Sequence, residues 1–149
     1  MPQTFETQHR VAFSDNDLAG FVHFTNYLRY MEETEHEFLR SHGLDVIFSD
    51  DKGSLGFPRV EAKSRFFSPA RYGHILDIKL TVVKNDGKRI DYTFEIRREE
   101  IPVAEGQLSV VCCRFPLDRD PYAIPIPDNV LDKIPVSYTH LTLPTKEEV

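Results

Sequence analysis

The sequence predicts an α+β fold, in which a curved antiparallel sheet of about five strands wraps around one long helix. Three observations support this prediction. The residues from Phe24 to Ser41 follow a helical period. Residues 57–114 contain several segments with the alternation typical of strands. Asn85-Asp-Gly87 separates two of these segments and is a strong signal for a hairpin, which joins antiparallel neighbours.

The first strand is predicted over Thr4–Phe13. Its alternate residues share one face, which carries Phe5, Thr7, His9, Val11 and Phe13. The segment Ser14–Asp17 is rich in turn-forming residues and is expected to end this strand.

The long helix is predicted over Phe24–Ser41. At about 1.5 Å per residue it is about 27 Å long, which is enough to cross a sheet. Gly43 is well placed to end the helix as its C′ residue. The apolar stripe consists of Phe24, Tyr27, Leu28, Met31, Phe38 and Leu39, whereas Glu32, Glu33, Glu35 and Glu37 are expected to form a solvated face.

Further strands are predicted at Phe57–Phe67, Ile75–Lys84, Arg89–Arg98 and Ile101–Arg114. The segment Leu44–Gly56 is mixed and rich in turn residues, so it receives no element. The proline-rich residues 116–127 are expected to leave the sheet, and Asp128–Ile134 to form a short closing helix.

Composition narrows the class of protein. The 149 residues fit one domain with a real core. A net charge of −6 argues against general nucleic-acid binding. The sequence contains neither a signal peptide nor the roughly 18 apolar residues needed to span a membrane, so we expect a cytoplasmic protein. Cys112 and Cys113 are adjacent and are expected to be unpaired apolar side chains in a reducing compartment.

The last segment requires separate treatment. Residues 135–149 look like a peptide that arises when sequencing-adapter DNA is translated at the end of a reading frame. We therefore expect one domain over residues 1–134, followed by a tail without an evolved role. A genuine tail is the alternative, and in both cases we expect this segment to be poorly packed.

The segment Asp17-Leu-Ala-Gly-Phe-Val-His-Phe-Thr-Asn-Tyr27 carries the chemistry that the sequence predicts. A carboxylate precedes a turn of small residues at Ala19-Gly20, and aromatic residues then open the helix. This order can place one acidic side chain beside the free N–H groups of a helix N-terminus. Those N–H groups stabilise negative charge on an oxygen, and the carboxylate can act as a nucleophile or a base. Acyl transfer needs both the N–H donors and the carboxylate. The alternative role for Asp17 is that of a turn aspartate, which Asp15 could fill equally well.

This segment, with Tyr30-Met-Glu after it, resembles the hot-dog-fold thioesterases of the 4-hydroxybenzoyl-CoA thioesterase type. Ser68-Pro-Ala-Arg-Tyr-Gly73 is similar to that family's turn between its second and third strands, and the resemblance covers about residues 4–134. The Tol-Pal-associated branch has His at position 24, where this chain has Phe24. The resemblance is therefore to the aryl/acyl-CoA branch, and it implies a hot-dog fold.

The resemblance also implies roles for individual residues. Asp17 would attack the thioester carbonyl or deprotonate a water molecule, and the Phe24 N–H would hold the oxyanion. His23 would contact the acyl group, hydrogen-bond to Asp17, or simply be exposed. Further expected substrate-binding residues are Gly20, Val22, Asn26 and Tyr27, although Asn26 and Tyr27 can instead fix the start of the helix.

The implied reaction is hydrolysis of an acyl- or aroyl-CoA thioester to the free acid and CoA, without metal or cofactor. The sequence has a single Glu-x-x-His motif, Glu33-x-x-His36, whereas a carboxylate-bridged metal site needs two such motifs and two further glutamates. Two alternatives remain: a hydratase or dehydratase on the same fold, and a non-catalytic protein that binds acyl-CoA or acyl carrier protein.

Binding of CoA phosphates requires local cations on an acidic protein. The hairpin supplies Lys84, Lys88 and Arg89, and further candidates are Arg59, Lys63, Arg65 and Arg71. Members of the family pair their sheets edge to edge, so we expect a homodimer or a dimer of dimers. An acyl carrier protein is a second candidate carrier of the acyl group.

Overall fold

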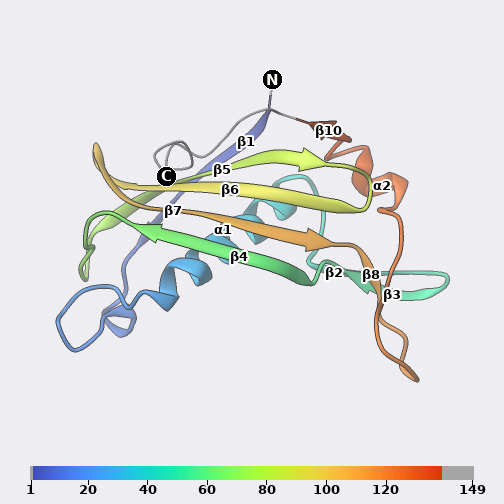
Figure 1. Cartoon of the computed structure of the whole chain (residues 1–149), viewed down its shortest axis with the longest axis horizontal. Coiled ribbons are helices and arrows are strands. Elements are labelled where there is room, and N and C mark those ends of the chain that lie inside the picture. The colour runs from blue at the N-terminus through green and yellow to red at the C-terminus, as the bar shows by residue number, and fades with distance from the viewer. Residues whose placement is uncertain (1, 139–149) are drawn as a thin grey trace.

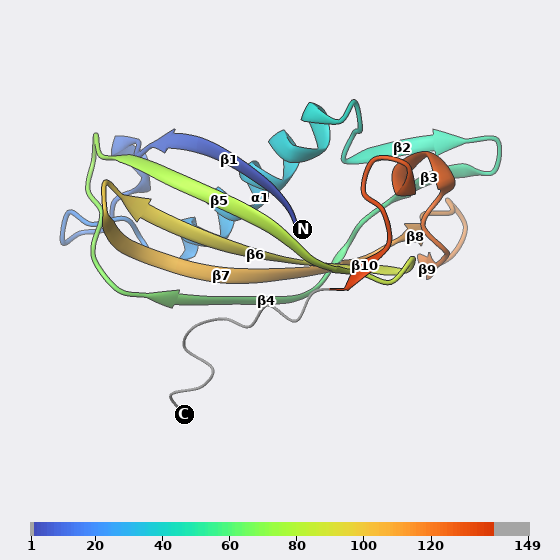
Figure 2. The ribbon, with the colours of Figure 1, turned by 90° about the horizontal axis from the view of Figure 1, so that it is seen from above.

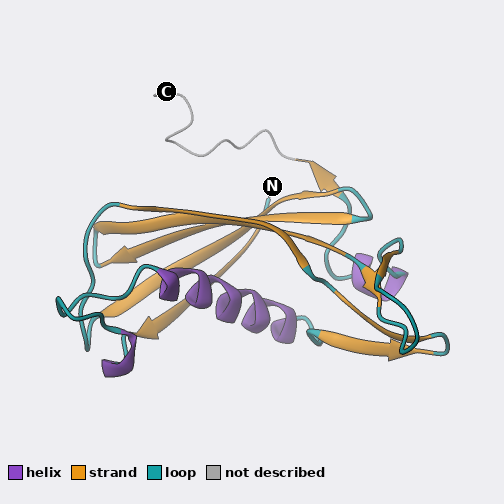
Figure 3. Ribbon diagram, turned by 60° about the horizontal axis from the view of Figure 1, so that its bottom comes forward, coloured by secondary structure: helices purple, strands orange, loops and turns teal. Residues whose placement is uncertain are grey.

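The computed structural model describes residues 2–138. One long helix, α1 (Thr25–Ser41), lies along one face of an antiparallel sheet, which confirms the predicted α+β architecture (Figure 1, Figure 3). The strands of this sheet follow the order β1-β5-β6-β7-β4, and β10 also pairs with β5. Their bounds are β1 Gln3–Arg10, β4 Arg59–Phe66, β5 Ile75–Asn85, β6 Arg89–Arg98, β7 Ile101–Val111 and β10 Ser137–Tyr138.

The core lies between α1 and the facing side of the sheet. Alternate residues of β5 and β6 are buried, as the period-2 pattern predicts, and they meet Tyr30, Met31 and Phe38 of the helix. Gly106 of β7 lets α1 approach closely, because a Cβ atom there would lie 2.5 Å from Met31 Sδ and 2.8 Å from the Lys63 carbonyl oxygen. This contact fixes the height of the helix above the sheet.

Helix α1 ends at Ser41 as predicted, and Gly43 is its C′ residue, whose φ of +73° suits glycine. The Gly43 N–H donates to Arg40 O, and the Leu44 N–H donates to Leu39 O. These are the two hydrogen bonds of a Schellman motif.

A second, smaller sheet was not predicted. Its order is β2-β3-β8-β9, and it lies beyond one end of the main sheet (Figure 2). Its strands are β2 Ile47–Asp50, β3 Gly53–Gly56, β8 Cys113–Arg114 and β9 Tyr122–Ala123. The predicted strand Ile101–Arg114 is therefore two strands that belong to different sheets. Cys112 and Cys113, at the point of change, are buried and free, as expected.

Two predictions about the N-terminal half were wrong. Strand β1 ends at Arg10, and Phe13 lies in a 3-10 helix, η1 (Phe13–Asp15), where it is 77% exposed. The chain turns away from the sheet here because the Asp15 carboxylate accepts the Ala12 N–H. Glu35 is not solvated. It is 1% exposed and accepts two hydrogen bonds from Arg59, at 2.5 and 3.2 Å.

The last elements of the described residues are α2 (Asp128–Leu131), which is shorter than the predicted helix, and β10, which pairs with β5. Val136 and Tyr138 are exposed, and most of the predicted tail, residues 139–149, lies outside the described residues. Within residues 2–138, no helix has the length and apolar character that a membrane span requires.

Candidate active site

Asp17 lies in a tight turn that orients its carboxylate. Its Oδ1 accepts the N–H groups of Ala19 at 2.9 Å and Phe21 at 3.2 Å, and the Asp17 N–H donates to Phe21 O. Gly20 has a φ of +87°, which glycine adopts without strain. No partner of Oδ2 is found among the described residues. One oxygen of the carboxylate is thus fixed, and the other is available to a substrate or a water molecule.

The start of α1 leaves one backbone donor unused. Phe24 caps the helix, and its own N–H has no hydrogen-bond partner within residues 2–138. The neighbouring N–H groups are occupied, since Asn26 N donates to His23 O and Thr25 N donates to His23 Nδ1 at 3.3 Å. A free N–H at the positive end of a helix dipole is suited to hold an oxyanion.

His23 is exposed and packs against the helix start. Its ring stacks on the Phe24 ring with centroids 4.7 Å apart, and Thr25 Oγ1 lies 2.7 Å from Nδ1. Nδ1 accepts the Thr25 N–H, and a neutral imidazole in this arrangement carries its proton on Nε2. The ring is therefore a side-chain cap for the first turn of the helix.

An aromatic pocket of about 370 Å³ lies beside the free amide and is open to the surface. Its walls come from the helix start and from the segment that follows β4, and they consist of Phe21, Val22, Phe24, Tyr27, Phe66, Phe67, Ser68 and Pro69. The pKa of Tyr27 is raised, mainly by burial, while a hydrogen bond with the Ala70 backbone opposes the shift and the negative charge of Asp17 adds to it. The Asp17 carboxylate is joined to the pocket wall through Phe21, whose N–H donates to Oδ1.

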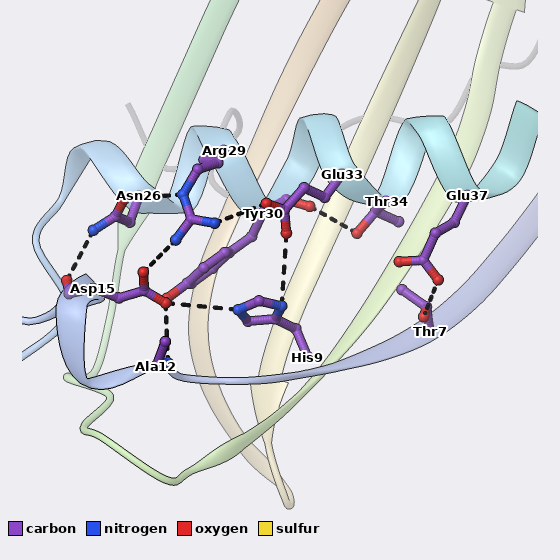
Figure 4. A network of polar contacts seen from close by, with 10 residues as sticks. All are labelled: Thr7, His9, Ala12, Asp15, Asn26, Arg29, Tyr30, Glu33, Thr34 and Glu37. Carbon is purple, nitrogen blue, oxygen red and sulfur yellow. Dashed lines mark hydrogen bonds and ion pairs between the residues drawn. The ribbon is translucent and has the colours of Figure 1, made fainter. Parts of the chain in front are cut away.

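Asp15 anchors this assembly (Figure 4). The carboxylate is buried and accepts hydrogen bonds from Ala12 N at 3.1 Å, from Tyr30 Oη at 2.7 Å and from the Arg29 guanidinium. The Asp15 carbonyl oxygen accepts the His23 N–H at 2.9 Å and Asn26 Nδ2 at 2.8 Å. One residue thus joins η1, the Asp17 turn and the first turn of α1.

The pKa values agree with this arrangement. Burial alone would raise the pKa of the Asp15 carboxyl, but the hydrogen bonds from Tyr30 and Ala12 and the charge of Arg29 together hold it below its usual value. The pKa of Tyr30 is raised by burial and by its hydrogen bond to Asp15. Asp15 is therefore an ionised structural carboxylate, and it is distinct from the exposed Asp17.

The structure brings some of the predicted site residues together. Val22, Phe24 and Tyr27 line the pocket, while Asp17, Gly20 and His23 adjoin its wall residues Phe21 and Phe24. Asn26 instead bonds to Asp15 O and accepts from Arg29 Nε, so its amide belongs to the scaffold.

The three hairpin cations predicted to bind phosphate do not lie at this site, whereas Arg71 lies beside it. Asp17 follows the end of β1 that pairs with Ile75, whereas the hairpin with Lys84, Lys88 and Arg89 lies at the other end of β5, about 33 Å away along the strand. Arg89 is engaged with Asp91 and Glu61. Among the other candidates, Arg59 pairs with Glu35 and Glu32, Lys63 pairs with Glu61, and Arg71 stacks on Phe21 with its Cζ 4.9 Å from the ring centre.

Sequence reasoning missed two groups of residues. The contacts of Asp15 with Arg29 and Tyr30 were not predicted. These two residues follow Asp15 by fourteen and fifteen positions, and no local pattern in the sequence connects them. The pocket residues Phe66 and Phe67 were read as the end of a strand. The sequence does contain a signal for them, because two adjacent aromatic residues stand at a strand end before Ser68-Pro69. Successive side chains of a strand point to opposite faces, so one of the two rings must point away from the core.

Replacing Asp15 tests its anchoring role. The folded-state pKa of Asp15 is depressed, so its contribution to stability is present above the unfolded-state pKa of about 4 and is lost as the pH falls through the folded-state value. Asp15→Asn should lower the free energy of unfolding by about 2–3 kcal/mol at pH 7, with a smaller loss at pH 3, measured by urea denaturation. The exposed Asp45→Asn is the control and should change stability by less than about 0.5 kcal/mol. An equal loss at both pH values would contradict the ionised anchor.

Comparison with known proteins identifies relatives of the whole domain. A 1,4-dihydroxy-2-naphthoyl-CoA hydrolase from Prochlorococcus marinus is 30% identical over 128 residues, which is 83% of each chain. The crystal structure of a 1,4-dihydroxy-2-naphthoyl-CoA thioesterase from Synechocystis superposes with a TM-score of 0.77 at 28% identity, covering 89% of this chain and 96% of that one.

The 4-hydroxybenzoyl-CoA thioesterase of Pseudomonas sp. strain CBS-3 shares the fold, with a TM-score of 0.73 at 20% identity over 87% of this chain and 97% of that one. The hot-dog fold implied by the sequence is thereby confirmed. The family model of the thioesterase-like superfamily matches residues 11–134, a range that contains the Asp17 turn, α1 and the main sheet except for β1 and β10. The chain belongs to the thioesterase-like superfamily.

Proposed function

We propose that this thioesterase hydrolyses acyl- or aroyl-CoA thioesters to the free acid and CoA, with Asp17 as the reacting carboxylate. One observation carries the proposal: the Asp17 carboxylate is hydrogen-bonded to the wall residue Phe21 of an aromatic pocket, and the same pocket is lined by Phe24, whose backbone N–H has no partner within residues 2–138. The relatives named for 1,4-dihydroxy-2-naphthoyl-CoA, an aroyl thioester, support the substrate class.

The reaction follows from this geometry in two versions. In the first, Asp17 Oδ2 attacks the thioester carbonyl, the Phe24 N–H stabilises the oxyanion, CoA leaves as thiolate, and water then cleaves the mixed anhydride. In the second, Asp17 takes a proton from a water molecule that attacks the same carbon, and the tetrahedral intermediate then expels CoA as thiolate to leave the free acid. The hydrogen bonds at Oδ1 orient the carboxylate in both versions. His23 offers its Nε2–H as an additional donor at the rim.

The pocket favours a flat acyl group. Phe24, Tyr27 and Phe66 form ring pairs with centroids 5.5 to 6.5 Å apart, which leaves aromatic faces and edges toward the space beside the free amide. Aryl rings stack well in such surroundings. Gly20 supports the pocket walls by allowing the tight turn, and Val22 supports them with its buried side chain.

We propose that the protein works as a homodimer, alone or within a dimer of dimers. Strand β4 is an edge of the main sheet, and no described strand pairs with its other side. Val60 and Phe66 on this strand are 51% and 49% exposed. Antiparallel pairing of β4 with its counterpart would cover this edge. It would also bring the hairpin end of one chain to the Asp17 end of the other, because β4 runs between these two ends.

This arrangement gives the hairpin cations a function. Lys84, Lys88 and Arg89 of one subunit would bind the CoA phosphates at the site of the other, and an acyl carrier protein could use the same surface through its phosphopantetheine.

The remaining proposals are a cytoplasmic location, supported by the free cysteines, and a domain that ends at residue 134. The family match ends at that residue, and residues 135–149 form the proposed tail.

Asp17→Asn tests the reacting carboxylate. The amide oxygen can still accept the Ala19 and Phe21 N–H groups, so the turn should persist while the nucleophile or base is lost. We expect kcat to fall about 10²–10⁴-fold for benzoyl-CoA, with little change in Tm, in an assay of released thiol. Asp45→Asn, at another exposed carboxylate, should keep wild-type turnover. Near wild-type turnover in the Asp17 variant would refute the proposal.

A pair of substitutions at Phe24 isolates the backbone donor. The φ of this residue, −57°, is compatible with proline, which lacks the N–H. Phe24→Ala removes the ring and keeps the N–H, so it serves as the matched control. We expect Phe24→Pro to have a kcat about 10²–10³-fold below that of Phe24→Ala, once circular dichroism shows that both are folded. Equal kcat values would exclude the Phe24 amide as the oxyanion donor.

Mixing two defective proteins tests the shared site. Asp17→Asn lacks the carboxylate, and a Lys84→Glu/Lys88→Glu/Arg89→Glu protein should have a raised KM for acyl-CoA. A mixed dimer would contain one site with an intact Asp17 and an intact partner hairpin, so the mixture, after subunit exchange, should regain activity at low acyl-CoA concentration. Activity no greater than the sum of the two separate proteins would indicate that each site is built from one chain.

A further inference from the structure

His9 of β1 lies between two carboxylates of the anchoring network (Figure 4). Its Nε2 is 3.7 Å from Asp15 Oδ2, and its Nδ1 is 3.7 Å from Glu33 Oε1. The ring packs on Tyr30 with centroids 4.3 Å apart. Nε2 is buried and has no hydrogen-bond partner among the described residues. Both ring nitrogens thus face acceptors at distances slightly too long for hydrogen bonds.

The charges around the ring favour a cation at this position. Asp15 from η1 and Glu33 from α1 contribute two negative charges, and Arg29 pairs with both of them. Tyr30 is a neutral phenol that donates to Asp15, and β5 presents the apolar Leu76 opposite His9. One guanidinium against two carboxylates leaves a net charge of −1. An imidazolium would balance it and would offer one N–H to each carboxylate.

The position of Asp15 connects this histidine to the active site. The Asp15 side chain is held by the network around His9, whereas its carbonyl oxygen holds the His23 N–H and the Asn26 side chain. Asp17 is two residues farther along the chain and Phe24 directly follows His23. Asp15 therefore links His9 to the segment that carries both halves of the proposed catalytic pair.

We propose that His9 is a proton-dependent positioning residue: its imidazolium form bridges Asp15 and Glu33 and holds the Asp17 turn and the start of α1 in the reactive arrangement. This inference rests on the proposed function of Asp17 and Phe24. It makes the activity depend on a titrating group that does not touch the substrate. Loss of the proton at alkaline pH lowers kcat with little change in KM, because the chemistry depends on alignment more than binding does.

The first test is the pH profile of kcat for aroyl-CoA hydrolysis. We expect wild-type kcat to fall about tenfold on the alkaline side. His9→Gln keeps a polar side chain of similar length and cannot titrate, so its profile should lack this fall and lie below that of the wild type at acidic pH. An unchanged alkaline fall in folded His9→Gln would overturn the proposal.

The second test uses the helix residues that flank the histidine. Glu33→Gln removes one of the two carboxylates, so the imidazolium loses a partner and the alkaline fall in kcat should move to lower pH. Glu37→Gln is the matched control, because Glu37 lies one turn farther along α1 and bonds to Thr7 instead. A shift of equal size in both variants, or no shift in Glu33→Gln, would contradict a specific bridge.

An NMR titration separates this inference from the proposed function. The ring signal of His9, assigned by its loss in His9→Gln, should respond to pH together with the backbone amide signals of His23 and Phe24. This coupling does not depend on turnover, so it would persist even if Asp17 proved not to be catalytic. Amide signals of His23 and Phe24 that do not follow the His9 titration would show that the proton does not reach the site.

Discussion

The site depends on the burial of the Asp15 carboxylate. This group accepts from three donors: the Ala12 amide at the start of η1, and Arg29 and Tyr30 on α1. A buried carboxylate is tolerated only when its lone pairs are used and its charge is paired, and removing one partner is costly. Because these donors are far apart in sequence, the carboxylate can be satisfied only when β1, η1 and α1 have come together. The Asp17 turn lies between these elements, so folding of the domain also fixes the turn.

The rest of the fold gives this assembly its orientation. Met31 packs on Gly106, and the Schellman motif at Gly43 ends the helix, so α1 is held at both its middle and its end. Phe24, whose N–H has no partner within residues 2–138, therefore has a fixed place in the wall of the pocket. Glu35 and Arg59 join α1 to β4 in a buried pair, which also ties the open edge of the sheet to the helix. A helix N-terminus next to an unpaired edge strand is a place where two subunits can build one site.

Local periodicity was enough to predict the main elements. The alternation of β5 and β6, the Asn85-Asp-Gly87 hairpin and the glycine after α1 are properties of neighbouring residues, and the structure agrees with each. Features set by distant residues were missed. Segment 44–56 has no clear period, and one of its strands pairs with residues 113–114, which pair in turn with residues 122–123. Glu35 looked solvated because Arg59, its partner, is 24 residues away. The motif singled out Asp17, but separating its exposed carboxylate from the buried Asp15 required the contacts with Arg29 and Tyr30.

The central claim is that a carboxylate and a backbone amide, held in place by Asp15, act on one thioester carbonyl. A crystal structure of the Asp17→Asn protein with bound benzoyl-CoA tests it most directly. The account predicts that the thioester oxygen lies about 2.7–3.1 Å from the Phe24 nitrogen, with the substituted side chain facing the carbonyl carbon and the aryl ring among Phe24, Tyr27 and Phe66. A thioester bound elsewhere, with the Phe24 amide facing water, would contradict it.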